Sequence, residues 1–225
     1  MSQSAHAPPV PHPLVKPRLR GVSHQWAFFL SLVAGLVLVI VAPAGRPTVA
    51  ALIYAVSLAG LFGTSALYHR VNWSSAGARR WMRRLDHSMI FLLIAGTYTP
   101  FALLSLEGTL STVILIVVWA GALGGIVMKL AWIDAPKPLT AAVYVCLGLV
   151  GAAATPDLVA EAGVTATALV AAGGVLYVTG AVVYARGRPD PVPEVFGYHE
   201  VFHALVIAAA ALQYAAVVFF VVPDS

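Results

Sequence analysis

The chain has 225 residues, of which 60% are hydrophobic and 10% are charged, with a formal net charge of +4 and a mean hydropathy of +0.88. Soluble domains carry about 25% charged residues. The composition therefore excludes a soluble globular protein and predicts an integral membrane protein. Because the protein is expected to lie in a membrane, membrane lipid is an expected partner. The sequence shows no phosphate-binding loop and no nucleic-acid signature, so nucleic acid is not an expected partner.

Residues 1–25 are rich in proline and basic side chains, and they predict a disordered cytoplasmic tail. Seven apolar stretches near bilayer length, about 20 residues for a helix, follow the tail. These stretches lack the alternation of polar and apolar residues that is typical of transmembrane β-strands. Helices are therefore the expected structure. They run over Trp26–Ala42, Thr48–His69, Leu85–Leu106, Leu110–Leu130, Leu139–Ala154, Val164–Ala185 and Val201–Val222. The expected fold is all-α, a seven-transmembrane helix bundle over residues 26–222, in the plasma membrane or, in a bacterium, the inner membrane.

The positions of lysine and arginine predict the orientation of this bundle. Seven spans place the N-terminus and the second, fourth and sixth loops on one side of the membrane. Of the 13 Lys and Arg residues, all except Arg46 fall on that side. Positive residues concentrate in cytoplasmic loops. We therefore expect a cytoplasmic N-terminus and an external C-terminus.

Polar side chains at membrane depth are costly, so each is a functional candidate. The second span ends in S-A-L-Y-H, where Ser65 and His69 share one helix face. The third span opens with L-D-H-S, which places Asp86 in its first turn. The seventh opens with H-E-V-F-H, where His199 and His203 again share a face. The predicted topology brings all five side chains to the cytoplasmic end of the bundle.

Three histidines and a water molecule form a standard catalytic zinc shell. We predict zinc ligands at His69, His199 and His203. Asp86 could then orient and deprotonate the water, and Ser65, one turn deeper, could hold the water or a substrate oxygen. The simpler alternative is that these histidines anchor helices at the interface or form interhelical hydrogen bonds.

The seventh span also reads as H-E-x-x-H, the zinc signature of many metalloproteases, in which Glu200 would be the general base. Intramembrane proteases of that type take an aspartate from a later helix, and no predicted helix follows this motif. We therefore interpret Glu200 as incidental to catalysis, a carboxylate beside the site or at the interface. His24 lies next to the tail and has no usable spacing.

The combined motifs carry a resemblance to a known family. S-x-x-x-H ending the second span, the aspartate in L-D-H-S-M-I-F-L-L-I-A-G-T-Y-T-P, and H-x-x-x-H opening the seventh resemble the hemolysin III branch of the progestin and adipoQ receptor (PAQR) family. The resemblance covers Val22 to Val222. It implies a seven-helix fold with a cytoplasmic N-terminus and zinc held by three histidines, with Asp86 and Ser65 beside it. It also implies lipid amide hydrolysis like the ceramidase activity of adiponectin receptors.

Several functions stay open at this point. The leading hypothesis is a zinc-dependent hydrolase of a lipid amide or ester. The alternatives are a membrane sensor or receptor with structural zinc, a pore-forming hemolysin-like protein, and, last, an H-E-x-x-H protease. A basic cluster opening the third span is a candidate contact for anionic lipid; it consists of Arg79, Arg80, Arg83 and Arg84. Neither the substrate nor the oligomeric state follows from the sequence.

Overall fold

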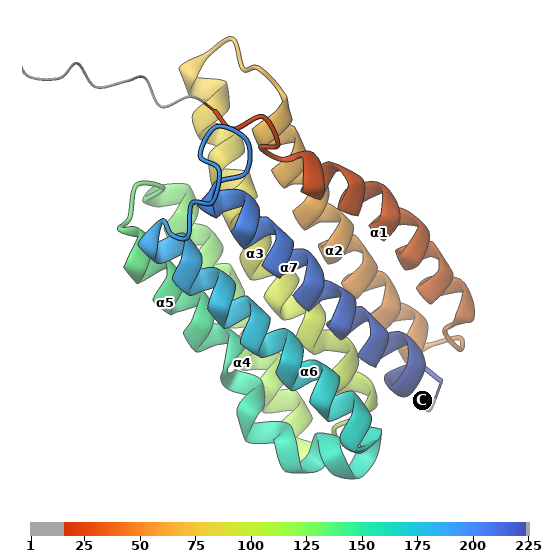
Figure 1. Cartoon of the computed structure of the whole chain (residues 1–225). Helices are drawn as coiled ribbons and strands as arrows, with labels where there is room; N and C mark the ends of the chain where they lie inside the picture. Colours follow the sequence, from red (N-terminus) through yellow and green to blue (C-terminus); the bar gives the residue numbers. More distant parts are fainter. Residues whose placement is uncertain (1–15, 224–225) are drawn as a thin grey trace, which may run out of the picture.

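The computed structural model describes residues 16–223, and seven α-helices run roughly side by side within them (Figure 1). They are α1 (Val22–Val41), α2 (Arg46–Arg70), α3 (Ala76–Leu104), α4 (Gly108–Ala131), α5 (Lys137–Gly148), α6 (Thr155–Arg186) and α7 (Tyr198–Ala216). A 3-10 turn over Val150–Ala154 precedes α6, and a π-helical turn over Val217–Val221 extends α7. No β-strand occurs in residues 16–223. Residues 1–15, most of the predicted tail, lie outside the described residues.

The helices are long and apolar enough to make this a multi-pass membrane protein. In the described part of the chain, six helical segments meet the length and hydropathy needed to cross a bilayer. One of them, Lys137–Arg186, contains both α5 and α6. With 12 residues, α5 alone is about 18 Å long, shorter than the roughly 30 Å of a hydrocarbon core. The all-helical class is confirmed, whereas the count of seven spans and the orientation stay predictions.

All seven helices begin earlier than the apolar pattern predicted, and at α1 and α3 the difference bears on the site. Helix α1 begins at Val22 rather than at Trp26, so its first turn includes His24. Helix α3 begins at Ala76 rather than at Leu85, with the Ser75 hydroxyl accepting a hydrogen bond from the Ala78 N–H. Asp86 therefore lies about three turns into α3, and its predicted place in the first turn was wrong. Polar and charged residues can extend a helix beyond its apolar run, which a hydropathy pattern does not register.

Helix α6 is interrupted at Gly163, whose backbone has φ 80° and ψ 168°. This conformation is open to glycine and strained for other residues. The regular helix after the break starts at Val164, where the sequence predicted the sixth span to begin. The preceding turns form a short separate helix that the apolar pattern did not predict.

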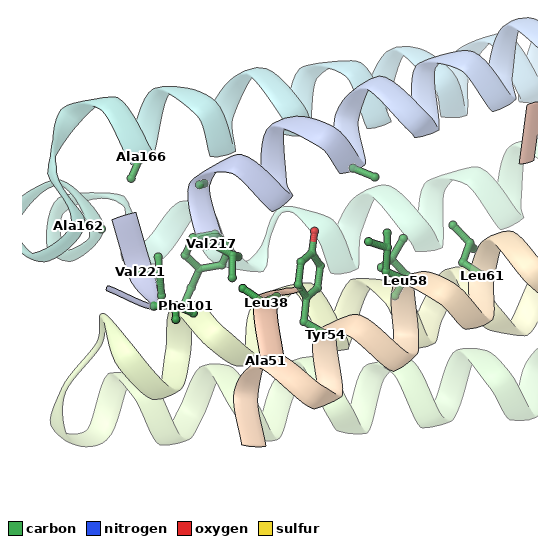
Figure 2. Packing of buried hydrophobic residues seen from close by; sticks show 14 of the residues in the cluster. Leu38, Ala51, Tyr54, Leu58, Leu61, Phe101, Ala162, Ala166, Val217 and Val221 are labelled. Carbon is green, nitrogen blue, oxygen red and sulfur yellow. The ribbon is translucent and has the colours of Figure 1, made fainter. Parts of the chain in front are cut away.

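The helices form a ring in which each packs against its neighbours in sequence, and α7 also packs against α1. One apolar cluster joins α1, α2, α3, α6 and α7 through residues that include Leu38, Tyr54, Phe101, Ala166 and Val217 (Figure 2). A second joins α3, α4 and α5 through Phe91, Val118 and Leu147. The bundle also encloses a cavity, lined mainly by α3, α5, α6 and α7, which is described below.

Candidate metal centre

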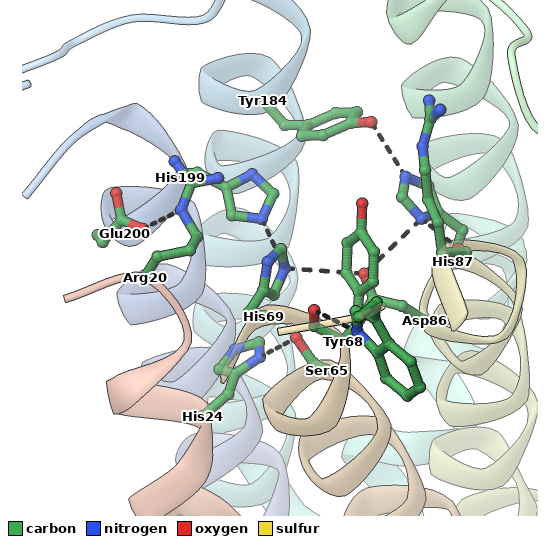
Figure 3. Close-up of polar contacts among 12 residues, drawn as sticks. Arg20, His24, Ser65, Tyr68, His69, Asp86, His87, Tyr184, His199 and Glu200 are labelled. Atoms are coloured by element: carbon green, nitrogen blue, oxygen red, sulfur yellow. Dashed lines mark hydrogen bonds and ion pairs between the residues drawn. The ribbon is translucent and has the colours of Figure 1, made fainter. Parts of the chain in front are cut away.

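Three histidines meet at one end of the bundle, which we call the histidine end. His69 lies in the last turn of α2, and His199 and His203 lie in the first two turns of α7. One ring nitrogen from each of the three lies within 4.8 Å of the others, and all three residues are buried. The His69 and His199 Nε2 atoms are 3.1 Å apart (Figure 3). The structure therefore brings together the three residues that the sequence grouped at one end of the bundle.

The local sequence explains why the two α7 histidines face α2. They are four residues apart, so they lie on one face of the helix. The Gly197 N–H at the start of α7 donates to the Glu200 carboxylate at 2.9 Å, which satisfies one of the free N–H groups of the first turn. This contact fixes the start of the helix and so the direction in which His199 and His203 point.

Asp86 lies beside the cluster, as predicted. Its Oδ2 is 3.8 Å from His69 Nε2, the same nitrogen that faces His199. The carboxylate is therefore on the side of the His69 ring where a metal would bind. Asp86 Oδ2 is also 3.7 Å from His87 Nδ1. The His87 ring also forms a hydrogen bond between Nδ1 and the Arg83 carbonyl and one between Nε2 and the Tyr184 hydroxyl.

Ser65 also reaches the site, and its hydrogen-bond partner is His24, for which the sequence offered no usable spacing. The Ser65 hydroxyl is 2.8 Å from His24 Nδ1. The His24 ring also stacks on His203, with 3.6 Å between ring centroids and 5° between planes. His24 is therefore a fourth imidazole of the site. The sequence could have indicated His24 if the polar residues just before the first apolar run had been counted as part of the helix. The predicted start at Trp26 left them out.

Glu200 is occupied by contacts of its own. It is 1% exposed, and its Oε1 accepts a hydrogen bond from Arg20 Nε at 2.5 Å (Figure 3). Its Oε2 accepts from the Gly197 N–H. Neither contact involves a histidine. The interpretation of Glu200 as a carboxylate beside the site fits this geometry, and its ion pair with Arg20 was not foreseen.

The turn before α1 covers the histidine end. The N–H groups of Arg18 and Leu19 donate to the carbonyls of Glu194 and Val195 in the α6–α7 loop. Gly21 has φ 78°, and a Cβ there would lie 2.5 Å from the Cβ of His69. The backbone therefore passes so close to His69 that a larger residue at position 21 would collide with it.

A cavity of about 540 Å³ runs from the histidine end into the bundle. At its polar end it is lined by His24, Ser65, Asp86, His87, His199 and His203. Further in, α3, α5, α6 and α7 line it mainly with aliphatic and aromatic side chains, among them Ile94, Phe101, Leu158 and Val206. The shape is suited to a molecule with one polar end and a long apolar part.

The donor set fits zinc. Two nitrogens bound to one tetrahedral zinc at 2.0–2.1 Å stand about 3.3 Å apart, close to the 3.1 Å between His69 and His199. His203 Nδ1 is buried and has no hydrogen-bond partner among the described residues. Three buried imidazoles without an acidic ligand are also a common set for catalytic zinc. A small side-chain rotation would bring the widest pair, at 4.8 Å, within the same shell.

Fold and site together define an integral, multi-pass membrane protein with a buried cluster of three histidines at one end of its bundle. The sequence matches the family described as "Haemolysin-III related" over residues 13–214. The chain therefore belongs to the haemolysin-III-related family, the hemolysin III branch of the PAQR family that its motifs predicted.

Curated relatives extend from bacteria to mammals. The chain is 34% identical over 170 residues to "Hemolysin-3 homolog" of Bacillus subtilis (strain 168), covering 76% of each chain. It is 31% identical over 207 residues to "Hemolysin-3" of Bacillus cereus, covering 91% of each. It is also 26% identical over 174 residues to "Monocyte to macrophage differentiation factor" of Homo sapiens, covering 75% of this chain and 69% of the relative.

Proposed function

We propose that this protein is a zinc-dependent hydrolase of a lipid amide or ester, in a seven-span bundle whose N-terminus and histidine end face the cytoplasm. The main support is that three buried imidazoles and the Asp86 carboxylate lie together at the polar end of a long apolar cavity. His69, His199 and His203 would hold the zinc.

Each part of the site has a role in this reaction. A bound zinc ion would supply a Lewis acid that polarises a carbonyl and acidifies a water molecule. Asp86 would accept a proton as the water oxygen bonds to the substrate carbonyl carbon. The same carboxyl group would return the proton to the amine or alcohol that leaves when its bond to this carbon breaks. Ser65, held by His24, would donate a hydrogen bond to a substrate oxygen.

The contacts of Glu200 argue against the protease alternative. A general base must reach the water in the cavity, yet Glu200 is not among the described residues that line the cavity, and its carboxylate is paired with Arg20 and the Gly197 N–H instead. The apolar lining of the cavity argues against an aqueous pore, although two relatives carry the name hemolysin-3. The remaining alternative, a sensor with structural zinc, shares the same ligands and differs in turnover.

The deciding experiment combines metal analysis with hydrolysis assays. Purified full-length protein should contain about one zinc per chain and release fatty acid from at least one member of a panel of lipid amides and esters. Asp86→Asn should keep zinc and lose roughly 10²–10⁴ in rate, while Glu200→Gln should lose little. An inactive Glu200→Gln with an active Asp86→Asn would support the protease. Bound zinc without any turnover would support the sensor.

The orientation can be tested separately. A fluorescent reporter fused at the N-terminus should be cytoplasmic, and one fused after Val222 should be external. A reporter on the opposite side at either end would contradict the proposed seven-span topology.

A further inference from the structure

The deep part of the cavity contains a pair of polar groups whose hydrogen bonding is incomplete. Gln213 of α7 and Tyr177 of α6 both line the cavity. Both lie away from the histidine end. Gln213 follows His203 by ten residues on α7, which places it about 15 Å further along the helix. Neither group has a role in the reaction proposed above.

The amide orientation of Gln213 is fixed by its one hydrogen bond. Its Nε2 donates to the Val170 carbonyl of α6 at 3.2 Å, and a carbonyl can accept only from the N–H side of the amide. Its Oε1 is therefore the free atom, and it is buried with no partner among the described residues. Gln213 as a whole is 6% exposed. The site thus presents a buried acceptor.

Tyr177 presents a hydroxyl on the neighbouring helix. It lies between Gly173 and Gly180, and these glycines pack on α7: a Cβ at Gly173 would be 3.0 Å from Gln213 Nε2 and one at Gly180 would be 3.3 Å from Phe202. Tyr177 therefore lies on the α7-facing side of α6. Its hydroxyl oxygen is also buried without a hydrogen-bond partner among residues 16–223.

Unpaired buried polar groups are rare in folded proteins and each destabilises the fold. Besides Tyr177 and Gln213, only His24 and His203 among the described cavity-lining residues have a buried side-chain atom without a partner, and both belong to the histidine end. Several other polar groups of the same cavity are satisfied within the protein. The Tyr98 hydroxyl bonds the Gly148 carbonyl and the Gly151 N–H, and the Thr167 hydroxyl donates to the Gly163 carbonyl. The contrast indicates that Tyr177 and Gln213 are arranged for a group that is not part of the protein.

We propose that Tyr177 and Gln213 form a second recognition site, for a hydroxyl group carried in the middle of a long lipid chain. The lipid hydroxyl would donate to Gln213 Oε1 and accept from the Tyr177 hydroxyl, completing the hydrogen bonding of both. The lipid carbonyl would lie at the histidine end, about 15 Å away. This inference rests on the proposed function, because it places the reactive group of the lipid at the histidines. The substrate class is then a mid-chain hydroxylated lipid rather than a plain acyl chain.

Binding of two matched fatty acids to the zinc-loaded, full-length protein in detergent tests the proposal. The probes are octadecanoic acid and its mid-chain hydroxylated derivative, measured by isothermal calorimetry. The wild type should bind the hydroxylated acid about tenfold more tightly, the effect of two modest hydrogen bonds. Tyr177→Phe and Gln213→Met should each reduce this preference to about threefold or less. Thr167→Val, which removes a satisfied hydroxyl from the same cavity, should keep it.

Two results would overturn the second site. The first is equal binding of both acids by the wild type, or an unchanged preference in Tyr177→Phe. The second concerns stability without lipid: removing an unpaired hydroxyl should leave the thermal midpoint unchanged or higher. A clearly lower midpoint for Tyr177→Phe would show that the hydroxyl already has a structural partner such as water. Tyr177→Phe decides the question even where Gln213→Met fails to fold.

The same measurements separate this proposal from the proposed reaction, since binding requires no turnover. A tenfold preference for the hydroxylated acid in a protein that hydrolyses nothing would contradict the hydrolase and support the second site. Hydrolysis of lipid amides with no preference at all would support the hydrolase and contradict the second site.

Discussion

Two ion pairs of similar length lie near the histidine end in different surroundings, one on the side of α7 and one on the side of α3. On the α7 flank, Arg20 and Glu200 are 2.5 Å apart, and their side chains are 20% and 2% exposed. On the α3 flank, Arg83 and Asp134 are 2.8 Å apart, and theirs are 37% and 62% exposed. An exposed pair contributes little because water solvates both partners once it breaks. Breaking a buried pair leaves an uncompensated charge. The α7 flank should therefore hold the site, and the α3 flank should be tolerant.

The largest effect is expected on bound zinc, when one of the three predicted histidine ligands is replaced. His69→Ala should reduce bound zinc from about one per chain to almost none, because three imidazoles are needed to hold the metal. Metal analysis of the purified protein gives the answer. His87→Gln is the matched control, since His87 contacts Asp86, Arg83 and Tyr184 but none of the three histidines, and it should keep its zinc. Full occupancy in His69→Ala would show that α2 is not part of the metal site.

The next effect should be on stability, at the α7 flank. Arg20→Ala leaves the Glu200 carboxylate buried and without its cation, which should cost about 3–5 kcal/mol. Thermal unfolding in detergent measures the loss. Adding Glu200→Gln to Arg20→Ala removes the unpaired charge and should restore part of the stability. A double variant no more stable than Arg20→Ala alone would indicate that the ion pair is not the source of the effect.

A smaller effect is expected from the stacked histidine of the same flank. His24→Phe keeps an aromatic ring against His203 but loses the hydrogen bond to Ser65. Zinc should stay bound, and lipid hydrolysis should fall about tenfold, as is typical when a residue that orients a metal site is changed. Ser65→Ala should cause a similar fall, and the double variant should add little, because the two residues act through one contact. Fully additive losses would contradict this coupling.

The smallest effect should come from the α3 flank. Arg83→Ala removes the exposed pair with Asp134 and should change stability by less than about 1 kcal/mol. Zinc content should not change. Unfolding measured at low and high salt checks the reason, since the small difference between wild type and variant should shrink as salt screens the pair. A loss as large as that of Arg20→Ala would remove the distinction between the two flanks.

The sequence predicted the centre of the site better than its surroundings. His69, His199 and His203 could be grouped because helical spacing and helix order place them at one end. His24 was missed because hydropathy placed the start of α1 four residues late. Arg20 could not be paired with Glu200, since that contact depends on how the turn before α1 folds back. Tyr177 and Gln213 gave no signal, because whether a buried polar atom has a partner depends on packing in three dimensions.

The turn that covers the histidine end has a consequence for the timing of metal exchange. Arg18 and Leu19 bind the α6–α7 loop through their backbone, Arg20 binds Glu200, and Gly21 passes against His69. How tightly an ion is held and how fast it leaves are then set by different contacts. The imidazoles would set the affinity, while the release rate would follow the opening of residues 17–21. A chelator added to wild-type protein should therefore remove zinc at a rate that levels off as chelator concentration rises. In a chain that starts after Gly21, removal should speed up even though every ligand is still present.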